Sequence, residues 1–289
     1  MKQAGNTKKR QRREKMCFWG VRIISYLVVL FVAAVLLDII IKGAPRINWA
    51  FLTEAPGPNH TTGGVFPAIV GTFCLIVGSM AIALPVGVFT AIYLSEYARN
   101  TWFTKLIRLC ITNLAGLPSI VFGLFGLGVF VILLQFGKSL LAGWLTLCFM
   151  ILPVIITTGE QALRSVPKGF REGSLAVGAT KWQMIRTNVL PYSLPGILTG
   201  SILSVARVAG ETAPILFTVA AFYTGLPKTI FSQVEALPYY LYTVSVNVPN
   251  IQEARPTAYG AALVLITLVF GLNMIAMTLR AKLRKKHQW

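Results

Sequence analysis

Long apolar segments alternate with short polar ones along most of the 289-residue chain. Six of the apolar segments approach or exceed the ~20 residues that an α-helix needs to cross a hydrocarbon core of about 30 Å. They occupy residues 18–41, 66–94, 106–134, 140–159, 192–222 and 257–279. The pattern therefore predicts an all-α integral membrane protein with six transmembrane helices.

The composition supports this prediction. Hydrophobic residues make up 55% of the chain and charged residues only 12%, whereas a typical soluble domain has about 25% charged residues. The segments divide the chain into a basic N-terminal tail (1–17), a first transmembrane helix with its external loop (18–64), a membrane domain (65–280) and a basic C-terminal tail (281–289). The first span is too long for a removable signal peptide, so it is expected to remain as an anchor.

The net charge of +18 is unevenly distributed along the chain. Of the 27 Lys and Arg residues, 21 lie in the N-terminal tail and the start of the first span, the second and fourth connecting segments, and the C-terminal tail. Because cationic residues accumulate on the cytoplasmic side of membrane proteins, we expect both termini in the cytoplasm. The basic tails then lie beside the anionic lipids of the bilayer, and no nucleic-acid partner is expected.

The sequence shows no arrangement that predicts catalysis or cofactor binding. Its four cysteines form no CxxC pair, which argues against a metal or disulfide site. Gly137–Ser139 resembles the end of a nucleotide-binding loop, but Ile132 stands where that loop needs its first glycine. We therefore expect no cofactor in this chain and no enzymatic activity of its own.

A polar insert between the fourth and fifth spans has the pattern of two short helices. Residues 167–177 are expected to form the first, and Gly178 is expected to interrupt it and change the chain direction. Thr180 and Gln183 have the spacing of a capping box at the start of the second helix. Pro191 marks the place where that helix is expected to give way to the next span.

The second helix of this insert has an apolar stripe formed by Trp182, Ile185 and Val189. An apolar and charged face exposed to the cytoplasm predicts a docking element for a soluble partner. The alternative is an amphipathic helix that lies on the membrane surface.

The spacing E-x₅-G-x₁₁-L-P in this insert resembles the cytoplasmic coupling loop of bacterial ABC importer permeases, here about residues 160–191. The chain differs from the usual pattern at Gly173, Ser174 and Asn188. The resemblance implies that the loop sits in a groove of a separate ATPase subunit and transmits its closure to the spans. The residues expected to couple to the ATPase are Glu172, Gly178, Ala179, Thr180, Leu190 and Pro191.

The fifth span combines small residues with two charges. Gly196, Gly200 and Ser204 recur every four residues and are expected to let helices approach closely. Arg207 and Glu211 are also four apart, so they share one helical face. Two interpretations stand: the charges neutralise each other inside the bundle, or they lie on the route of an anion.

The string "ARVAGETAPILFT" at 206–218 resembles the A-type permease family of phosphate ABC importers. "APGPNHTTGGVFPAIVGT", "LAGLPSIVFGLFGLG" and "GATKWQMIRTNVLP" resemble the same family, so the resemblance covers the chain from about residue 51 to its end. It implies the type I ABC importer permease fold and a location in the bacterial cytoplasmic membrane. Arg207, Glu211 and Thr212 would then belong to the substrate pathway.

The family also implies an assembly in which this chain supplies half of the pathway. The partners would be a sister C-type permease, a dimeric ATPase that binds ATP and Mg²⁺, and an extracytoplasmic phosphate-binding protein. Three alternatives remain: a permease for another oxyanion such as sulfate, molybdate or phosphonate, an ion-coupled secondary carrier, and a membrane scaffold without transport. A secondary carrier would favour internal repeats or acidic groups, and a scaffold would not need Arg207 inside a span.

Overall fold

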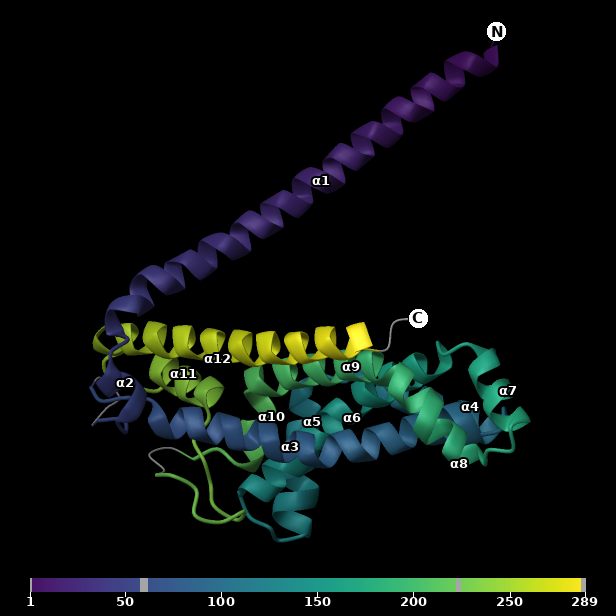
Figure 1. Ribbon diagram of the computed structural model, residues 1–289. Coiled ribbons are helices and arrows are strands. Elements are labelled where there is room, and N and C mark those ends of the chain that lie inside the picture. The colour runs from purple at the N-terminus through teal and green to yellow at the C-terminus, as the bar shows by residue number, and fades with distance from the viewer. Residues whose placement is uncertain (1, 58–61, 222–224, 287–289) are drawn as a thin grey trace.

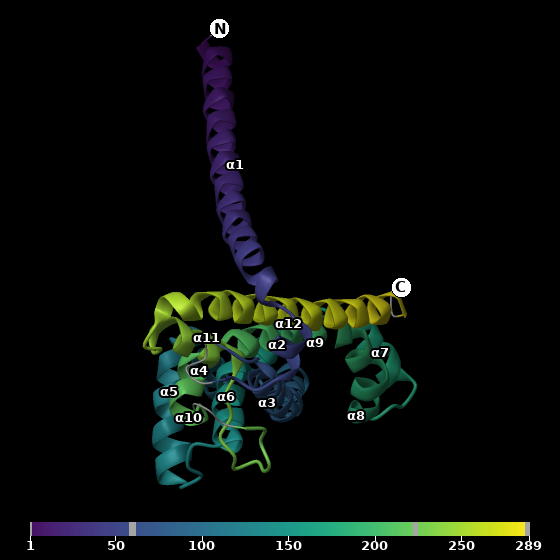
Figure 2. The same ribbon diagram turned by 90° about the vertical axis from the view of Figure 1, so that its left-hand side faces the viewer.

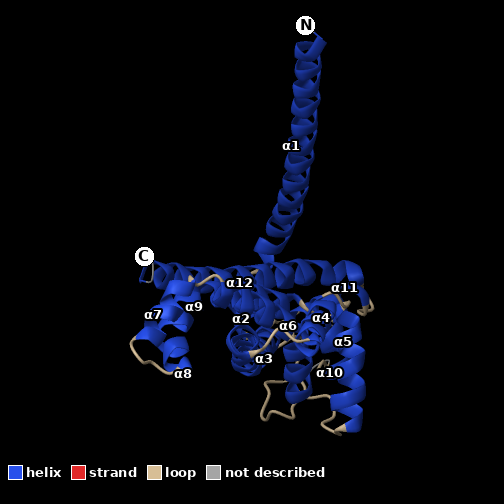
Figure 3. Ribbon diagram, turned by 90° about the vertical axis from the view of Figure 1, so that its right-hand side faces the viewer, coloured by secondary structure: helices blue, strands red, loops and turns tan. Residues whose placement is uncertain are grey.

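The computed structural model describes residues 2–57, 62–221 and 225–286, which form helices joined by short loops (Figures 1 and 3). The α-helices are α1 (Lys2–Gly43), α2 (Trp49–Thr53), α3 (Phe66–Ile92), α4 (Trp102–Ala115), α5 (Ser119–Gly126), α6 (Leu140–Arg164), α7 (Lys168–Ala176), α8 (Lys181–Met184), α9 (Leu190–Gly210), α10 (Ala213–Thr218), α11 (Leu237–Val246) and α12 (Ile251–Lys286). Three π-helical segments, Tyr93–Tyr97, Leu127–Leu133 and Ile185–Val189, extend α3, α5 and α8.

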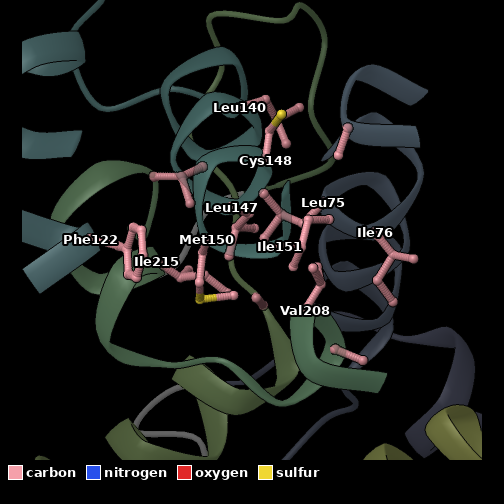
Figure 4. Packing of buried hydrophobic residues seen from close by; sticks show 14 of the residues in the cluster. Leu75, Ile76, Phe122, Leu140, Leu147, Cys148, Met150, Ile151, Val208 and Ile215 are labelled. Atoms are coloured by element: carbon pink, nitrogen blue, oxygen red, sulfur yellow. The ribbon is translucent and has the colours of Figure 1, made fainter. Parts of the chain in front are cut away.

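Helices α3, α6 and α9 form the centre of the bundle. Their apolar side chains interlock in one buried cluster, in which Leu75 of α3, Ile151 of α6 and Val208 of α9 lie together (Figure 4). Helix α12 covers α9 and α11 on one side, while α7 and α8 lie at one end of the bundle, away from α5 and α10 (Figure 2). We call this end the coupling-loop end.

Helix α1 leaves the body of the protein and meets it only near its C-terminal end (Figure 1). There Lys42 pairs with Asp38 at 2.6 Å, and the hydroxyl of Tyr259 in α12 donates to Asp38 at 3.2 Å. The helix contains the predicted span 18–41 and continues through most of the basic N-terminal tail. Most of the large apolar side chains of α1 are exposed. Contacts with lipid or with another protein must therefore stabilise this helix, because few of its side chains pack against the rest of the chain.

The structure confirms most of the predicted spans and corrects the third. Five helical segments are long and apolar enough to cross a membrane, and the pair 102–115 and 119–133 adds a sixth if it crosses as one unit. That pair is bent by 103°, so the prediction of one uninterrupted helix over 106–134 is wrong. The cause is local: α4 ends at Gly116, and Pro118 disfavours helical backbone at Leu117.

The fifth span also differs from its prediction. The sequence suggested a helix over 192–222, but α9 ends at Gly210 and the chain is extended at Glu211 before the short α10 begins. Pro214 lies in the first turn of α10, where a missing N–H costs no hydrogen bond. Proline here starts a new helix rather than bending the old one.

Candidate functional site

The break between α9 and α10 carries the charged pair that the sequence singled out. Glu211 is the C-terminal cap of α9 with an extended backbone, and Thr212 precedes the first turn of α10. The carbonyl of Thr212 accepts a hydrogen bond from the N–H of Leu216 at 3.0 Å. Glu211 and Thr212 therefore form the two-residue link, and Arg207 lies one turn before it.

The register of α9 against α6 places this break about halfway along α6. Gly196 approaches Ala162 and Gly200 approaches Thr158, which is the register of two antiparallel helices. Continuing it puts residue 207 opposite Ile151, which shares a buried cluster with the neighbouring Val208. Ile151 is about 17 Å from the start of α6 at 1.5 Å per residue. The charged pair thus lies near the middle of the bundle, where discontinuous membrane helices commonly form substrate sites.

Arg207 and Glu211 form a single long contact. The Nε of Arg207 lies 3.4 Å from Oε1 of Glu211, and their side chains are 31% and 15% exposed. Within the described residues, no other hydrogen bond or ion pair engages this guanidinium. A charged group facing hydrocarbon at the bilayer centre costs about 2.5–3.5 kcal/mol or more. The open side of Arg207 must therefore meet a partner protein or water.

The predicted small-residue stripe of α9 is confirmed as a packing surface. Gly196 and Gly200 face α6 so closely that a Cβ would collide with Ala162 or Thr158. Ser204 is buried one turn further on. Any larger residue at Gly200 would push α9 away from α6 and displace the break that α9 carries.

The first half of the coupling loop agrees with the sequence prediction. Helix α7 presents Glu172 to solvent, and Gly178 follows it with φ +84°. Thr180 accepts from the N–H of Gln183, and the Gln183 side chain accepts from the N–H of Thr180, which is the predicted capping box. Ala179 lies between the turn and this cap, half-buried. The loop is therefore a defined helix–turn–helix.

The second half departs from the prediction at Pro191. The second helix does not end there, because residues 181–210 form one continuous helical segment. A π-helical turn, Ile185–Val189, precedes the proline, and the N–H of Leu190 reaches the carbonyl of Ile185. Such local widening lets a membrane helix pass through a proline. Leu190 and Arg207 thus belong to the same continuous helix and lie about 25 Å apart along its axis, at 1.5 Å per residue.

The predicted apolar stripe of this helix does not form a single exposed docking face, because two of its residues face the bundle and one faces outward. Ile185 and Val189 are fully buried and pack with Leu163 and Val166 at the end of α6. Trp182 stays exposed, as do Leu175 and Val177 of the preceding segment, the latter at 84%. The exposed apolar surface of the loop therefore surrounds the Gly178 turn rather than following the second helix.

An ion pair that the sequence analysis missed holds the loop to the bundle. The Nη2 of Arg171 lies 2.8 Å from Oε1 of Glu96, and Glu96 is only 6% exposed. Arg171 also donates to the carbonyls of Val166 at 2.6 Å and Leu163 at 2.8 Å. We call these contacts the Arg171 clamp. Because Glu96 and Arg171 are 75 residues apart, no local pattern connects them.

Two departures from the usual coupling-loop sequence turn out to be partners. Asn188, which replaces a common aliphatic residue, donates its side-chain amide to the hydroxyl of Ser174. Ser174 is buried in α7, so this bond ties α7 to the helix that follows the turn. The hydroxyl of Ser174 thus donates to the carbonyl of Phe170 and accepts from Asn188, so the two unusual residues satisfy part of each other's hydrogen bonding.

The Gly178 turn yields a testable prediction. If the loop docks on a separate ATPase subunit, as the resemblance implies, Gly178→Ala should weaken that association several-fold, because a φ of +84° costs a residue with a Cβ about 1–2 kcal/mol. Gly173→Ala is the matched control, since both glycines have open space around a Cβ and only Gly178 has positive φ. Pull-down of the ATPase at equal permease expression measures the effect. Equal association of the two variants would contradict a structural need for glycine at the turn.

Comparison of the fold with solved structures defines the class of protein. The chain superimposes on a bacterial ABC transporter involved in alginate import with a TM-score of 0.64 and 16% identity, covering 95% of this chain and 98% of that one. A chain of the inward-facing MetNI methionine ABC transporter gives a TM-score of 0.58 with 20% identity, over 76% and 94% of the two chains. The fold is therefore that of a type I ABC importer permease.

Sequence comparison identifies the family. The model described as "Binding-protein-dependent transport system inner membrane component" matches residues 83–286, and the chain belongs to this family. The probable ABC transporter permease YqgI of Bacillus subtilis is 35% identical over 86% of this chain and 88% of its own. The phosphate transport system permease PstA of Yersinia pestis is 35% identical over 88% and 84%, and the probable PstA of Methanocaldococcus jannaschii is 33% identical over 91% and 92%. Permeases of this family work with an ATPase and a substrate-binding protein.

Proposed function

We propose that this chain is the A-type permease subunit of an ATP-driven importer of inorganic phosphate. The observation that carries the proposal is a partly exposed arginine in a break of the central helix α9, near the middle of the bundle. The relatives named as phosphate permeases support the substrate class. ATP hydrolysis would take place in another chain, which binds the ATP and Mg²⁺.

The geometry of the pair suits transient binding of an oxyanion. Arg207 offers a fixed positive charge with several N–H donors, of which Glu211 engages one nitrogen at 3.4 Å. The carboxylate reduces the net attraction, and the hydroxyl of Thr212 adds a neutral hydrogen-bonding group beside it. A conduit needs binding that is weak enough for release. The second half of the pathway would come from a sister C-type permease facing the open side of Arg207.

The coupling loop would dock into a groove of one subunit of the ATPase dimer. Leu175, Val177 and Trp182 supply an exposed apolar surface around the Gly178 turn, and Glu172 supplies a charge beside it. Movement of this loop would reach Arg207 along the continuous helix that contains α8 and α9. An extracytoplasmic phosphate-binding protein would deliver the ion at the opposite end.

The proposed orientation places both termini and the coupling loop in the cytoplasm. A reporter fused after Trp289 should therefore be cytoplasmic, and one inserted near Asn59 should be external. The two sites lie on opposite sides only if the bent pair 102–115 and 119–133 crosses as one span, because the other spans between them number four. Protease or dye accessibility in intact cells measures this. Reporters on one side would remove the six-span arrangement.

The experiment that tests the proposed function is uptake of labelled phosphate by the complete complex reconstituted in vesicles. Uptake should need internal ATP and the binding protein, and excess unlabelled sulfate or molybdate should not reduce it. Competition by those ions would assign the permease to another oxyanion. Uptake driven by an ion gradient without ATP would instead indicate a secondary carrier.

A further inference from the structure

A cavity of about 250 Å³ with charged, polar and apolar lining residues lies between α4 and α6, apart from the α9–α10 break. It opens where Arg108 of α4 faces Glu160 and Arg164 of α6, and the other polar residues at its wall are Thr112, Thr157 and Gln161. Arg164 is the last residue of α6, four residues before α7 begins at Lys168. The cavity therefore lies at the coupling-loop end of the bundle.

The charges around the cavity are unbalanced. Glu160 is 12% exposed and accepts a hydrogen bond from Nε of Arg108 at 2.9 Å, and it forms an ion pair with Arg164, whose Nη2 lies 2.7 Å from the same carboxylate oxygen. One carboxylate thus stands between two guanidinium groups, which leaves one net positive charge at the wall. In a partly buried site such a charge attracts an anion more strongly than it would in bulk water.

The remaining hydrogen-bonding groups also fit an anion. Arg108 uses Nε for Glu160 and Nη2 for the carbonyl of Leu94 at 2.8 Å. Each guanidinium has five N–H groups in a planar fork, a geometry that matches phosphate oxygens. Nη1 of Arg108 and the nitrogens of Arg164 beyond its contact with Glu160 remain to donate, within the contacts of the described residues. The hydroxyls of Thr112 and Thr157 donate to the carbonyls of Arg108 and Pro153 in their own helices, so the two guanidinium groups and the amide of Gln161 are the side chains left to donate to an anion.

The volume of the cavity suits a small ligand. Pockets for metabolites of drug-like size usually measure about 300–1,000 Å³, and this one is smaller at about 250 Å³. It has room for one oxyanion with some water, or for the phosphate of a headgroup whose acyl chains stay outside. The ligand is thus defined by its phosphate group.

We propose that this cavity binds a phosphate group at the coupling-loop end of the permease. Two sources share this chemistry: an inorganic phosphate ion leaving the pathway, which rests on the proposed function, and the headgroup of an anionic phospholipid, which does not. In either case the bound group draws Arg108 and Arg164 together. It thereby strengthens the connection between α4 and the helix from which the coupling loop begins.

Arg164→Gln tests the site with little risk to folding. The buried Glu160 keeps its contact with Arg108, and Arg164 is half exposed. Lys105→Gln is the matched control, because Lys105 is an exposed cation on α4 one turn from Arg108 and does not line the cavity. Both variants are purified as the complete permease–ATPase complex without nucleotide.

Two binding measurements distinguish the sources. Equilibrium dialysis of radiolabelled inorganic phosphate, with the complex in phosphatidylcholine nanodiscs, reports the free ion. Native mass spectrometry after extraction from phosphatidylglycerol membranes counts retained anionic lipid. We expect Arg164→Gln to weaken one of these by about tenfold or more, the usual effect of losing a charged hydrogen bond, and Lys105→Gln to change neither. Binding sites in the ATPase subunits are the same in all variants, so they do not affect the difference in binding between one variant and another.

Each outcome of the two binding measurements either identifies the ligand of the site or shows that the site does not exist. A loss confined to phosphate binding identifies the free ion, and a loss confined to retained lipid identifies the headgroup. If Arg164→Gln matches the wild-type complex in both measurements, the proposed site does not exist. Phosphate uptake is measured separately, so a complex that fails to import phosphate contradicts the proposed function without deciding this one.

Discussion

Arg207→Gln is expected to reduce phosphate uptake per assembled complex by at least about tenfold, because a charged hydrogen bond to the ion is worth about 1.5–3 kcal/mol. The substitution removes the only positive charge at the α9–α10 break within the described residues. The same change at Arg255, which is exposed near the start of α12, is the matched control and should leave uptake unchanged. Uptake is normalised to the complex recovered with its ATPase.

The single variant has a second effect that must be separated from the first. Without Arg207, Glu211 becomes an unpaired and mostly buried charge, and breaking a buried pair in this way costs about 3–5 kcal/mol. Arg207→Gln with Glu211→Gln removes that charge as well, so the double variant should assemble normally. If it still imports poorly, the arginine acts on the ion. Near-normal import by the double variant would show that Arg207 and Glu211 only neutralise each other's charge and do not act on the ion.

Arg171→Gln is expected to lower the thermal stability of the complex substantially and to uncouple ATP hydrolysis from phosphate uptake. The substitution leaves Glu96 buried without its partner, which costs about 3–5 kcal/mol. It also removes the donors to the carbonyls of Leu163 and Val166. Lys168→Gln, an exposed cation on the same helix, is the control. The midpoint of heat-induced unfolding and the ratio of ATP hydrolysed to phosphate imported measure the two effects.

A companion variant tests whether the Arg171 clamp acts through the charge of Glu96. Arg171→Gln with Glu96→Gln removes the unpaired carboxylate, so part of the lost stability should return. The loss of coupling should persist, because α7 is still no longer held to the end of α3. Full recovery of coupling in the double variant would show that the clamp stabilises the fold without transmitting movement.

Local features of this protein could be predicted because their causes lie within a few residues. The capping box of Thr180 and Gln183 and the change of chain direction at Gly178 were expected from neighbouring residues and are present. The contact of Arg207 with Glu211 was expected from their four-residue spacing and is present, although Glu211 lies just beyond the last helical residue of α9. Most spans were found because crossing a membrane requires a long apolar stretch. The bend at Pro118 had a local signal as well, but continuous hydrophobicity concealed it.

The same sequence by itself determined neither the depth of the charged pair nor the contacts that fix the coupling loop. The bond from Arg171 to Glu96 joins residues 75 apart, and that from Arg108 to Glu160 joins residues 52 apart. Which face of the second coupling helix is buried was also decided by packing, since Ile185 and Val189 meet the end of α6. Hydropathy and helical periodicity specify which segments enter the membrane and which residues share a face. The packing of the helices against one another, including the close approach of α9 to α6 through Gly196 and Gly200, decides which residues meet across the bundle.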